Sequence, residues 1–524
     1  MPVSYAQQQL WLADRLDPGS PTYTIAEAIE LRGALDASTL HASLEQMVER
    51  HEILRTTFDM REGQIVQLIH ARMKPAMKVI DLSLPPADDA DLKLSELESA
   101  HAAAPFDLKQ GPLTRFALVR FSADRHVLLA AFHHIVFDGW SSGVFWRDLS
   151  ALYNAARQQE HTALPELPIQ YADYAQWQQE QLQGDTKRRL FDYWRQKLTP
   201  AAESMELPCD HPRPPHPTHR GDLESLALPE AVSKQLAALA GENGATTFMA
   251  ALAAFKTLLY RYDGRNDIVV GTPVANRSRP ELADLIGFFV NTLVLRTRID
   301  GLHSFRQVLQ AVKQTVAGAL SHEEMPFEQL VEQLAPSRGP GRNPLFQVVF
   351  MQRVESSDPV NLYGLTASRR ALATHTAKFD LMLVTIQTPR GLECRIEYST
   401  DLFEAGTIRR MLSHFAALLT AACAEPNKPI ASLPVMDEDE LDLVVNAFNH
   451  GETTYPRDET IHERFAQVTG RSPNAIALIC EGRSLTYRQL DEPANRLARY
   501  LRSRGVGPDV MVSICLDRNV DVII

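Results

Sequence analysis

The chain has 524 residues, of which 45% are hydrophobic and 23% charged, and its formal net charge at pH 7 is −12. This length allows about three domains of ordinary size, and the apolar content is sufficient for a large core. The acidic balance, with no basic cluster, argues against nucleic acid and anionic membranes as partners.

Neither hydropathy nor cysteine content indicates export or membrane insertion. No stretch approaches the roughly 18 consecutive apolar residues of a membrane span. The N-terminal residues Met1-Pro-Val-Ser lack the basic segment and apolar core of a signal peptide. The five cysteines are odd in number and scattered, at Cys209, Cys394, Cys423, Cys480 and Cys515. We therefore expect reduced thiols and a cytoplasmic protein.

The first third of the chain mixes helix and strand patterns. Residues 37–50 are predicted to form a helix with an apolar face, capped near Asp36 or Ser38. Short apolar runs near 64–69, 115–121 and 126–132 predict strands. These elements indicate a domain in which α and β elements are mixed.

The stretch His133-His134-Ile-Val-Phe-Asp138-Gly139 is the most informative in the chain. It directly follows the last of these strands, and Ser141-Ser142 is a predicted N-cap for a helix over the next residues. The histidines should therefore lie at the mouth of a strand–loop–helix turn. Histidine exchanges protons readily near neutral pH, so this turn is a candidate catalytic site. A single histidine at a strand end is more often structural.

The middle of the chain predicts a second set of α and β elements. A helical stretch near 171–197 leads into it, and prolines between 208 and 217 indicate a stiff connector. Residues 246–261 are apolar nearly all round, which predicts a buried helix. Residues 268–271, 292–296 and 346–350 are predicted strands.

The last part of the chain differs in character. Residues 436–441 are acidic and predicted to be loop-like. Thr486 and Gln489 form a plausible capping box for a helix. Pro493 falls inside that helix, where it should cost about 3 kcal/mol or force a kink.

Seven motifs in order resemble those of the condensation domains of nonribosomal peptide synthetases, which belong to the chloramphenicol-acetyltransferase-like acyltransferases. The departures from the family pattern at Gln9, Glu323 and Glu324 lie outside the histidine motif. The resemblance covers roughly residues 1–435. The motifs are residues 4–11, 50–56, 133–139, 171–177, 286–292, 322–328 and 342–345.

The resemblance implies an α/β (α+β) fold with two chloramphenicol-acetyltransferase-like lobes. These would form a V-shaped pseudo-dimer with a tunnel between them and a single His-His centre. We expect the N-lobe at 1–178 and the C-lobe at 179–435.

Residues 449–456 resemble the linker between condensation and adenylation domains, and residues 485–498 resemble the first adenylation motif. We therefore expect a linker at 436–459 and a truncated adenylation-domain start at 460–524. No phosphate loop or catalytic lysine follows, so adenylation activity is expected to be absent. The apolar faces of this fragment should be exposed.

The implied reaction is amide formation between two thioester-bound substrates. Each would be carried on the phosphopantetheine arm of a donor or acceptor carrier domain. His134 is expected to contact the attacking amine, and the backbone N–H of Gly139 is suited to support the donor carbonyl. His133 should pack inward. No metal or other bound cofactor is expected, and the protein should be a monomer.

The resemblance also suggests residues that support the site or contact substrate. Asp138 is expected to be structural, paired with Arg50 as first candidate or Arg55 as second. Trp140 has even odds of contacting substrate. For Asn291 and Arg342, near the expected lobe interface, a structural role is favoured over chemistry.

Several functions stay open. The motifs at 138–141 and 288–292 resemble subtypes that accept a D-configured residue or load a starter acyl chain, in which case acyl-CoA would be a further partner. An epimerisation domain shares the double histidine but usually does not precede an adenylation domain. Alcohol O-acyltransferases share only part of the motif. A non-catalytic docking platform and an inactive gene fragment are the remaining alternatives.

Overall fold

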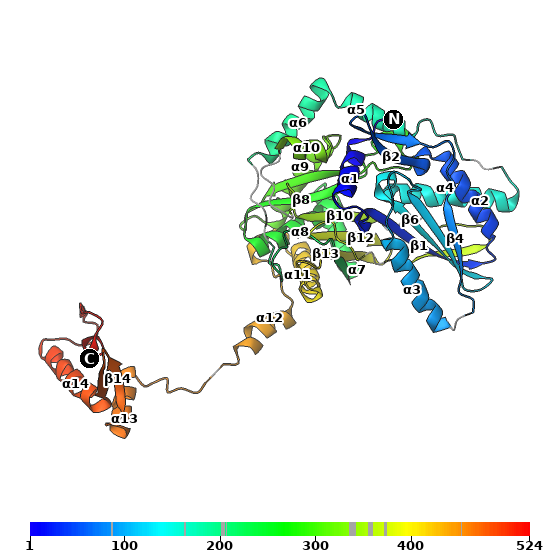
Figure 1. Cartoon of the computed structure of the whole chain (residues 1–524). Helices are drawn as coiled ribbons and strands as arrows, with labels where there is room; N and C mark the ends of the chain where they lie inside the picture. The colour runs from blue at the N-terminus through cyan, green and yellow to red at the C-terminus, as the bar shows by residue number, and fades with distance from the viewer. Residues whose placement is uncertain are drawn as a thin grey trace. The chain divides into compact units, whose positions relative to one another are not determined.

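The computed structural model describes residues 1–524 except 85–86, 162–163, 201–204, 206, 335–341, 355–359, 371, 373–374 and 452. It divides into two compact units, Met1–Glu440 and Leu441–Ile524. The larger unit contains two lobes, each built on one mixed sheet (Figure 1). Glu452, in the expected linker, lies outside the described residues.

The first lobe is organised around a sheet with the strand order β11-β1-β6-β5-β4. Strand β6 is its centre, and every residue of this strand after Arg125 is buried, as its unbroken apolar run predicted. The bounds are β1 (Thr24–Gly33), β4 (Ala76–Asp81), β5 (Thr114–Arg120), β6 (Arg125–His133) and β11 (Leu365–Arg370).

Helices and a hairpin cover this sheet. The predicted helix 37–50 is confirmed as α2, and Oδ1 of its N-cap Asp36 accepts hydrogen bonds from the N–H groups of Ser38 and Thr39, each at 3.0 Å. Helix α2 packs against α4 and joins the core of the lobe. The bounds are α1 (Tyr5–Leu16), α2 (Ala37–Arg50), α3 (Ala87–Ala103), α4 (Gly139–Gln158), β2 (Thr56–Arg61) and β3 (Gln64–Ile69).

The predicted helical stretch near 171–197 is two helices, α5 (Tyr171–Gln181) and α6 (Gly184–Leu198). Gly184 has a φ of +56° at the break. This left-handed conformation is open to glycine without the penalty that a Cβ atom brings, so the chain can change direction here. The sequence suggested one helix because apolar residues continue on both sides of this break.

The second lobe has a sheet with the order β7-β13-β12-β10-β8-β9. Its strands are β7 (Gly221–Ala227), β8 (Asp267–Val274), β9 (Asn291–Arg298), β10 (Val348–Val354), β12 (Leu381–Thr388) and β13 (Gly391–Ser399). Its helices are α7 (Glu230–Glu242), α8 (Thr247–Asp263), α9 (Phe305–Leu320), α10 (Phe327–Leu334) and α11 (Ala405–Ala424). Helix α8 is the predicted buried helix, since all residues from Ala250 to Leu259 are buried.

The two lobes interlock within the larger unit. Strand β11 comes from the second half of the chain but pairs with β1 in the first-lobe sheet. The loop between β8 and β9 places Leu282, Ile286 and Phe289 in the first-lobe core. Helix α1 packs against both α10 and the short 3₁₀ helix η3 (His134–Val136) (Figure 1). The mixed α/β fold with two lobes, expected from the resemblance, is confirmed.

Residues 438–445 form helix α12 (Glu438–Val445), so the loop predicted for the acidic segment is wrong from Glu438 onward. Asp437 Oδ1 accepts a hydrogen bond from the Glu440 N–H at 2.9 Å. Three acidic residues occupy the first turn, where the helix dipole favours negative charge. The acidic composition that suggested a loop therefore stabilises a helix start.

The smaller unit consists of α13 (Ile461–Arg471), β14 (Ile476–Cys480), β15 (Arg483–Thr486) and α14 (Tyr487–Ser503). The capping box of Thr486 and Gln489 is confirmed, and α14 continues through Pro493. Among the described residues of this unit, Leu490 is the one that is buried, whereas apolar side chains such as Met511 and Ile514 are exposed. Over the described part of the chain, no helix combines the length and apolarity needed to cross a bilayer.

Lys256 lies in the middle of α8 and is fully buried. Its Nζ donates hydrogen bonds to the carbonyl of Leu295 at 2.6 Å, to Thr297 Oγ1 at 2.8 Å and to the carbonyl of Ile268 at 3.3 Å. All three N–H groups are thereby used, and they tie the helix to β8 and β9.

We predict that Lys256→Met destabilises the protein by about 1–3 kcal/mol, because it keeps the volume but leaves hydrogen-bond acceptors unpaired. Lys256→Ala also creates a cavity and should lose about 2–5 kcal/mol. Urea unfolding followed by tryptophan fluorescence measures both. Equal stabilities of the two variants would contradict this account of the lysine.

Candidate active site

The predicted strand–loop–helix turn is present. Strand β6 ends at His133, His134 begins η3, and α4 begins at Gly139. The N-cap of α4 is Asp138, whose Oδ1 accepts a hydrogen bond from the Ser141 N–H at 2.7 Å. The prediction that Ser141-Ser142 caps this helix is therefore wrong. The aspartate of the motif starts the helix and so fixes the path of the loop.

His133 packs inward, as expected. Its side chain is buried, and its ring meets that of Phe106 edge to face at 6.1 Å. Nδ1 accepts a hydrogen bond from the Ile135 N–H at 3.1 Å. His133 therefore shapes the turn that carries its neighbour.

His134 is held in one tautomer by the same loop. Its Nδ1 lies 2.7 Å from the carbonyl oxygen of Phe137. Since a carbonyl can only accept, Nδ1 carries the proton and Nε2 keeps a lone pair. The ring lies 4.7 Å from that of Phe288 and retains accessible surface. The turn thus presents an unprotonated ring nitrogen that solvent can reach.

Both histidines are held in the neutral form. Desolvation, reinforced by the positive charge of Lys378, moves the pKa of His134 well below its ordinary value. The same two causes lower the pKa of His133 to about 3. A neutral imidazole with a free Nε2 can accept a proton or a hydrogen bond, but it cannot donate one from that atom.

Asp138 is completely buried and pairs with Arg277, which comes from the loop after β8 in the second lobe. Arg277 Nη2 lies 3.3 Å from Asp138 Oδ1, and 1% of the arginine side chain is exposed. The backbone N–H of Phe289 donates to Asp138 Oδ2 at 3.1 Å. Asp138 thus has an arginine partner, but this partner is Arg277 and neither Arg50 nor Arg55, the two candidates.

Arg50 and Arg55 have other partners. Arg50 Nε pairs with the buried carboxylate of Asp148 at 3.1 Å. Arg55 pairs with Glu52 at 3.0 Å and donates to the carbonyl of Val48, also at 3.0 Å. Arg50 therefore ties the end of α2 to α4, whereas Arg55 holds the turn that follows α2.

A polar clamp surrounds the Asp138–Arg277 pair. Arg277 Nη1 donates to the carbonyls of Leu282 and Leu285, and its guanidinium lies 3.9 Å from the centre of the Phe289 ring. Ser141 Oγ donates to the Gly287 carbonyl at 2.9 Å and accepts from the Gly287 N–H at 3.0 Å. The start of α4 is thereby fastened to the loop of the other lobe.

Tyr171 completes the contact between the lobes. Its hydroxyl donates to the Phe288 carbonyl at 2.6 Å and lies 2.9 Å from Ser4 Oγ. Its ring covers Gly287 so closely that a Cβ atom there would stand 2.0 Å from the ring. Gly287 is therefore required for the close approach of the Tyr171 ring to the backbone. The hydrogen bond from Tyr171 to the Phe288 carbonyl then holds Phe288, whose ring packs against His134.

Gly139 differs from Gly287 because it faces open space. It is exposed, and a Cβ atom added there would meet nothing within 4 Å. The neighbouring Trp140 is 50% exposed, and its Nε1 donates to the Ala283 carbonyl at 2.9 Å. The helix start thus has room beside it for another molecule.

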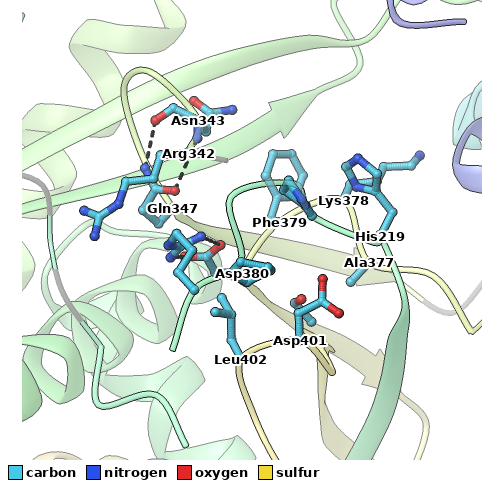
Figure 2. A pocket seen from close by; sticks show the side chains of 14 residues that line it. His219, Arg342, Asn343, Gln347, Ala377, Lys378, Phe379, Asp380, Asp401 and Leu402 are labelled. Carbon is cyan, nitrogen blue, oxygen red and sulfur yellow. Dashed lines mark hydrogen bonds and ion pairs between the residues drawn. The ribbon is translucent and has the colours of Figure 1, made fainter. Parts of the chain in front are cut away.

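Asn291 and Arg342, both expected near the lobe interface, have different surroundings. Asn291 Nδ2 donates to the carbonyls of Glu323 and Met325 at 2.6 and 2.7 Å, which anchors β9 to the segment before α10. Arg342 lines a cavity of about 290 Å³ in the second lobe, together with Lys378, Asp380 and other residues but not His134 (Figure 2). The structural role expected for Asn291 stays a prediction, which its two hydrogen bonds support.

Sequence reasoning missed Arg277 and Lys378. Arg277 follows a predicted strand by a few residues, so an arginine at a strand end was the available signal, but nothing local links it to Asp138. Lys378 comes from a short segment before β12 that carries no periodic pattern.

Among the residues that the structure describes, no group of three or more histidine, cysteine or acidic side chains could hold a metal ion.

Comparison with protein families gives two matches. Residues 1–444 match the family described as Condensation domain, and residues 465–524 match AMP-binding enzyme. Chondramide synthase cmdD of Chondromyces crocatus is 40% identical over 529 residues, covering 100% of this chain and 13% of the relative. Phosphinothricin tripeptide synthetase PhsC of Streptomyces viridochromogenes is 40% identical over 540 residues, covering 100% and 48%. The chain thus spans less than half of each relative.

Two solved structures are also similar to this chain. The four-domain nonribosomal peptide synthetase holo-AB3403, bound to AMP and glycine, superposes with a TM-score of 0.80 at 26% identity over 96% of this chain and 39% of that chain. The X-domain from teicoplanin biosynthesis, solved in complex with OxyB, has a TM-score of 0.75 at 28% identity over 84% and 96%.

We predict strong energetic coupling between Asp138 and Arg277. Asp138→Ala and Arg277→Ala should each cost about 3–5 kcal/mol, because each leaves a buried charge unpaired. In a double-mutant cycle measured by urea unfolding, the coupling energy should be about 1–3 kcal/mol. The same cycle between Asp138 and Arg50, which do not touch, should give less than about 0.5 kcal/mol. Similar coupling in both cycles would refute the assigned partner.

Proposed function

Since the chain belongs to the condensation-domain family of nonribosomal peptide synthetases and continues into the start of an AMP-binding domain, we propose that it forms an amide bond between two thioester-bound substrates. The α-amine of a carrier-bound aminoacyl group attacks the thioester carbonyl of an upstream acyl or peptidyl group. The partners are a donor and an acceptor carrier domain, whose phosphopantetheine arms meet at His134 in a tunnel between the lobes.

The observation that carries this proposal is the free Nε2 of a neutral His134, fixed by the bond from Nδ1 to the Phe137 carbonyl. The amine nitrogen bonds to the thioester carbon, and the carbonyl π electrons move to oxygen. The carbon–sulfur bond then breaks, and the amine proton passes by way of Nε2 to the departing thiolate. Orientation of the reactants can contribute roughly 7–11 kcal/mol, and general-base help adds roughly 10²- to 10⁴-fold.

Gly139 is proposed to support the developing oxyanion with its backbone N–H. This residue begins α4, where N–H groups lack partners within the helix and the helix dipole is positive. The open space beside Gly139 gives the donor carbonyl access to it.

We favour a D-residue-accepting or starter subtype, because the sequences at 138–141 and 288–292 resemble those subtypes. A starter domain would take acyl-CoA as a further partner.

We retain the domain limits 1–178, 179–435, 436–459 and 460–524 as a proposal. For 460–524 we propose no adenylation activity, since its described residues bury a single apolar side chain.

A docking platform is the second candidate. The X-domain solved in complex with OxyB shows that a structurally similar domain binds another protein. Epimerisation is a less favoured alternative, because the AMP-binding start follows the condensation domain directly. A platform would need no neutral, accessible histidine, which is why we prefer catalysis.

His134→Ala should lower amide formation by at least about 10²-fold. The full chain is incubated with acyl-CoA or acyl-carrier donors and aminoacyl-carrier acceptors, and the amide is quantified by mass spectrometry. Because the pKa of His134 is lowered, the imidazole should stay neutral as pH falls through 6.5, so the acidic limb of the wild-type rate should follow protonation of the attacking amine and show no additional fall near pH 6.5. Undiminished product from His134→Ala would exclude its role in the reaction, and carrier binding without product would support the platform.

Gly139→Ala should fold normally but react about tenfold or more slowly, since its methyl group would occupy the space proposed for the donor carbonyl. Thermal unfolding checks the first expectation, and the amide assay checks the second. Gly143→Ala, in the same helix and also without atoms near the added Cβ, is the matched control. Equal rates for the two variants would count against a substrate next to Gly139.

A further inference from the structure

Arg115 lies on β5, beside the strand that carries the two histidines, and the proposed mechanism assigns it no role. Its register partner on β6 is Ala131, two positions before His133. The residue is half-buried, and its Nε is buried without a hydrogen-bond partner among the described residues. An arginine held at this depth next to the site is a candidate for a role in positioning it.

The guanidinium of Arg115 binds the backbone where α3 ends. Nη2 donates to the carbonyls of His101 and Ala104 at 2.9 and 2.8 Å, and Nη1 donates to the carbonyl of Pro105 at 3.4 Å. Carbonyls in the last turn of a helix have no partner within the helix, and the helix dipole favours a cation there. Arg115 therefore fixes the path of the chain from α3 into Phe106.

The ring of Phe106 contacts both Arg115 and His133. Cζ of the arginine lies 4.2 Å from the centre of the ring, which is within the range of a cation–π contact. The ring meets the imidazole of His133 at 85°, with 6.1 Å between the two centres. The guanidinium thus holds the ring of Phe106 as well as the backbone before it, and Phe106 carries this constraint to the first histidine.

The plane of the His133 ring decides whether the turn is capped. Nδ1 of His133 accepts a hydrogen bond from the Ile135 N–H at 3.1 Å and so caps η3. A backbone N–H can only donate, so in the neutral ring Nδ1 is unprotonated and Nε2 carries the proton. His134, with its proton on Nδ1, has the opposite tautomer. Because the lone pair of Nδ1 lies in the ring plane, the cap forms at one orientation of that plane.

We propose that Arg115 is a positioning residue for His134. It acts through the edge-to-face contact of Phe106 with His133, which holds the first imidazole in the plane that caps η3. His134 is the first residue of that turn, so the cap sets where its ring is placed. The effect on the turn follows from these contacts alone, whereas the effect on catalysis rests on the proposed amide-forming function.

Arginine is suited to this task because its head is planar and forked. The fork reaches several carbonyls at once, and the flat face lies over an aromatic ring. Lysine keeps the charge but offers neither the fork nor the face, so Arg115→Lys separates geometry from charge. Arg120→Lys makes the same chemical change at the far end of β5, where the side chain is 50% exposed and pairs with Asp81. It is the matched control.

The direct test follows the Ile135 N–H in the full chain without substrate. Hydrogen exchange is measured by mass spectrometry at single-residue resolution, with the amide of Leu128 in the middle of β6 as internal reference. Exchange at Ile135 should be at least about fivefold faster in Arg115→Lys and Phe106→Leu than in the wild type, because the amide loses its acceptor. Exchange at Leu128 should not change, since β6 is paired on both sides.

Two further variants should keep the wild-type exchange at Ile135. Phe106→Tyr retains the aromatic ring, and Arg120→Lys leaves the contact untouched. Unchanged exchange at Ile135 in folded Arg115→Lys and Phe106→Leu would overturn the proposal. Equal acceleration at Ile135 and Leu128 would overturn it as well, because that result assigns the effect to a loss of global stability.

The amide assay tests the consequence for catalysis. In Arg115→Lys and Phe106→Leu, kcat should fall at least about tenfold while KM for the aminoacyl carrier stays within about twofold, because a displaced imidazole misaligns the reactants without altering carrier binding. Phe106→Tyr and Arg120→Lys should keep the wild-type kcat. Wild-type kcat in the two variants with accelerated exchange would reject the role of Arg115 in catalysis. Accelerated exchange without any amide from the wild type would uphold the positioning of the turn and reject the proposed reaction.

Discussion

The buried ion pair between Asp138 and Arg277 is the interaction on which the rest of the site depends. Its two members come from different lobes, 139 positions apart in sequence, and both are almost completely excluded from solvent. Pairing two buried charges adds little net stability, because desolvation offsets their attraction. What the pair determines is geometry. Asp138 caps α4 and binds the loop of the second lobe with the same carboxylate, so the helix start and that loop cannot shift independently.

The ion pair determines the orientation of His134 through a series of contacts between the start of α4, the loop after β8 and the imidazole ring. Ser141 and Asp138 bind the backbone of Gly287 and Phe289, and Tyr171 binds the carbonyl between them. Phe288 is thereby fixed at three consecutive backbone positions, and its ring stands against the imidazole. The Phe137 carbonyl sets the tautomer from the other side. The ring is thus held by the first lobe through a hydrogen bond and by the second through packing.

Local sequence patterns predicted the elements that position the site, but not the contacts between them. Helix α2, the buried strand β6 and the buried helix α8 follow from periodicity and capping, which depend on neighbouring residues only. The partner of Asp138 depends on which loop of a second lobe reaches the turn, whereas Arg50 and Arg55 were candidates because of the family resemblance. The predictions for the segment around Gly184 and for residues 438–445 were wrong for a related reason. One backbone angle and one cap decide them, and composition registers neither.

The lowered pKa of His134 bears on what this residue can do. A base with a depressed pKa remains available over a wide pH range, but it is a weaker proton acceptor, because basicity and pKa fall together. In the proposed reaction this loss matters little, since a thioester is already activated and the amine becomes acidic only after it has bonded to carbon. A weak acceptor in a fixed orientation can then align the amine lone pair and take the proton late. The lowered pKa of His134 therefore favours a centre that orients neutral reactants over one that removes a proton in advance.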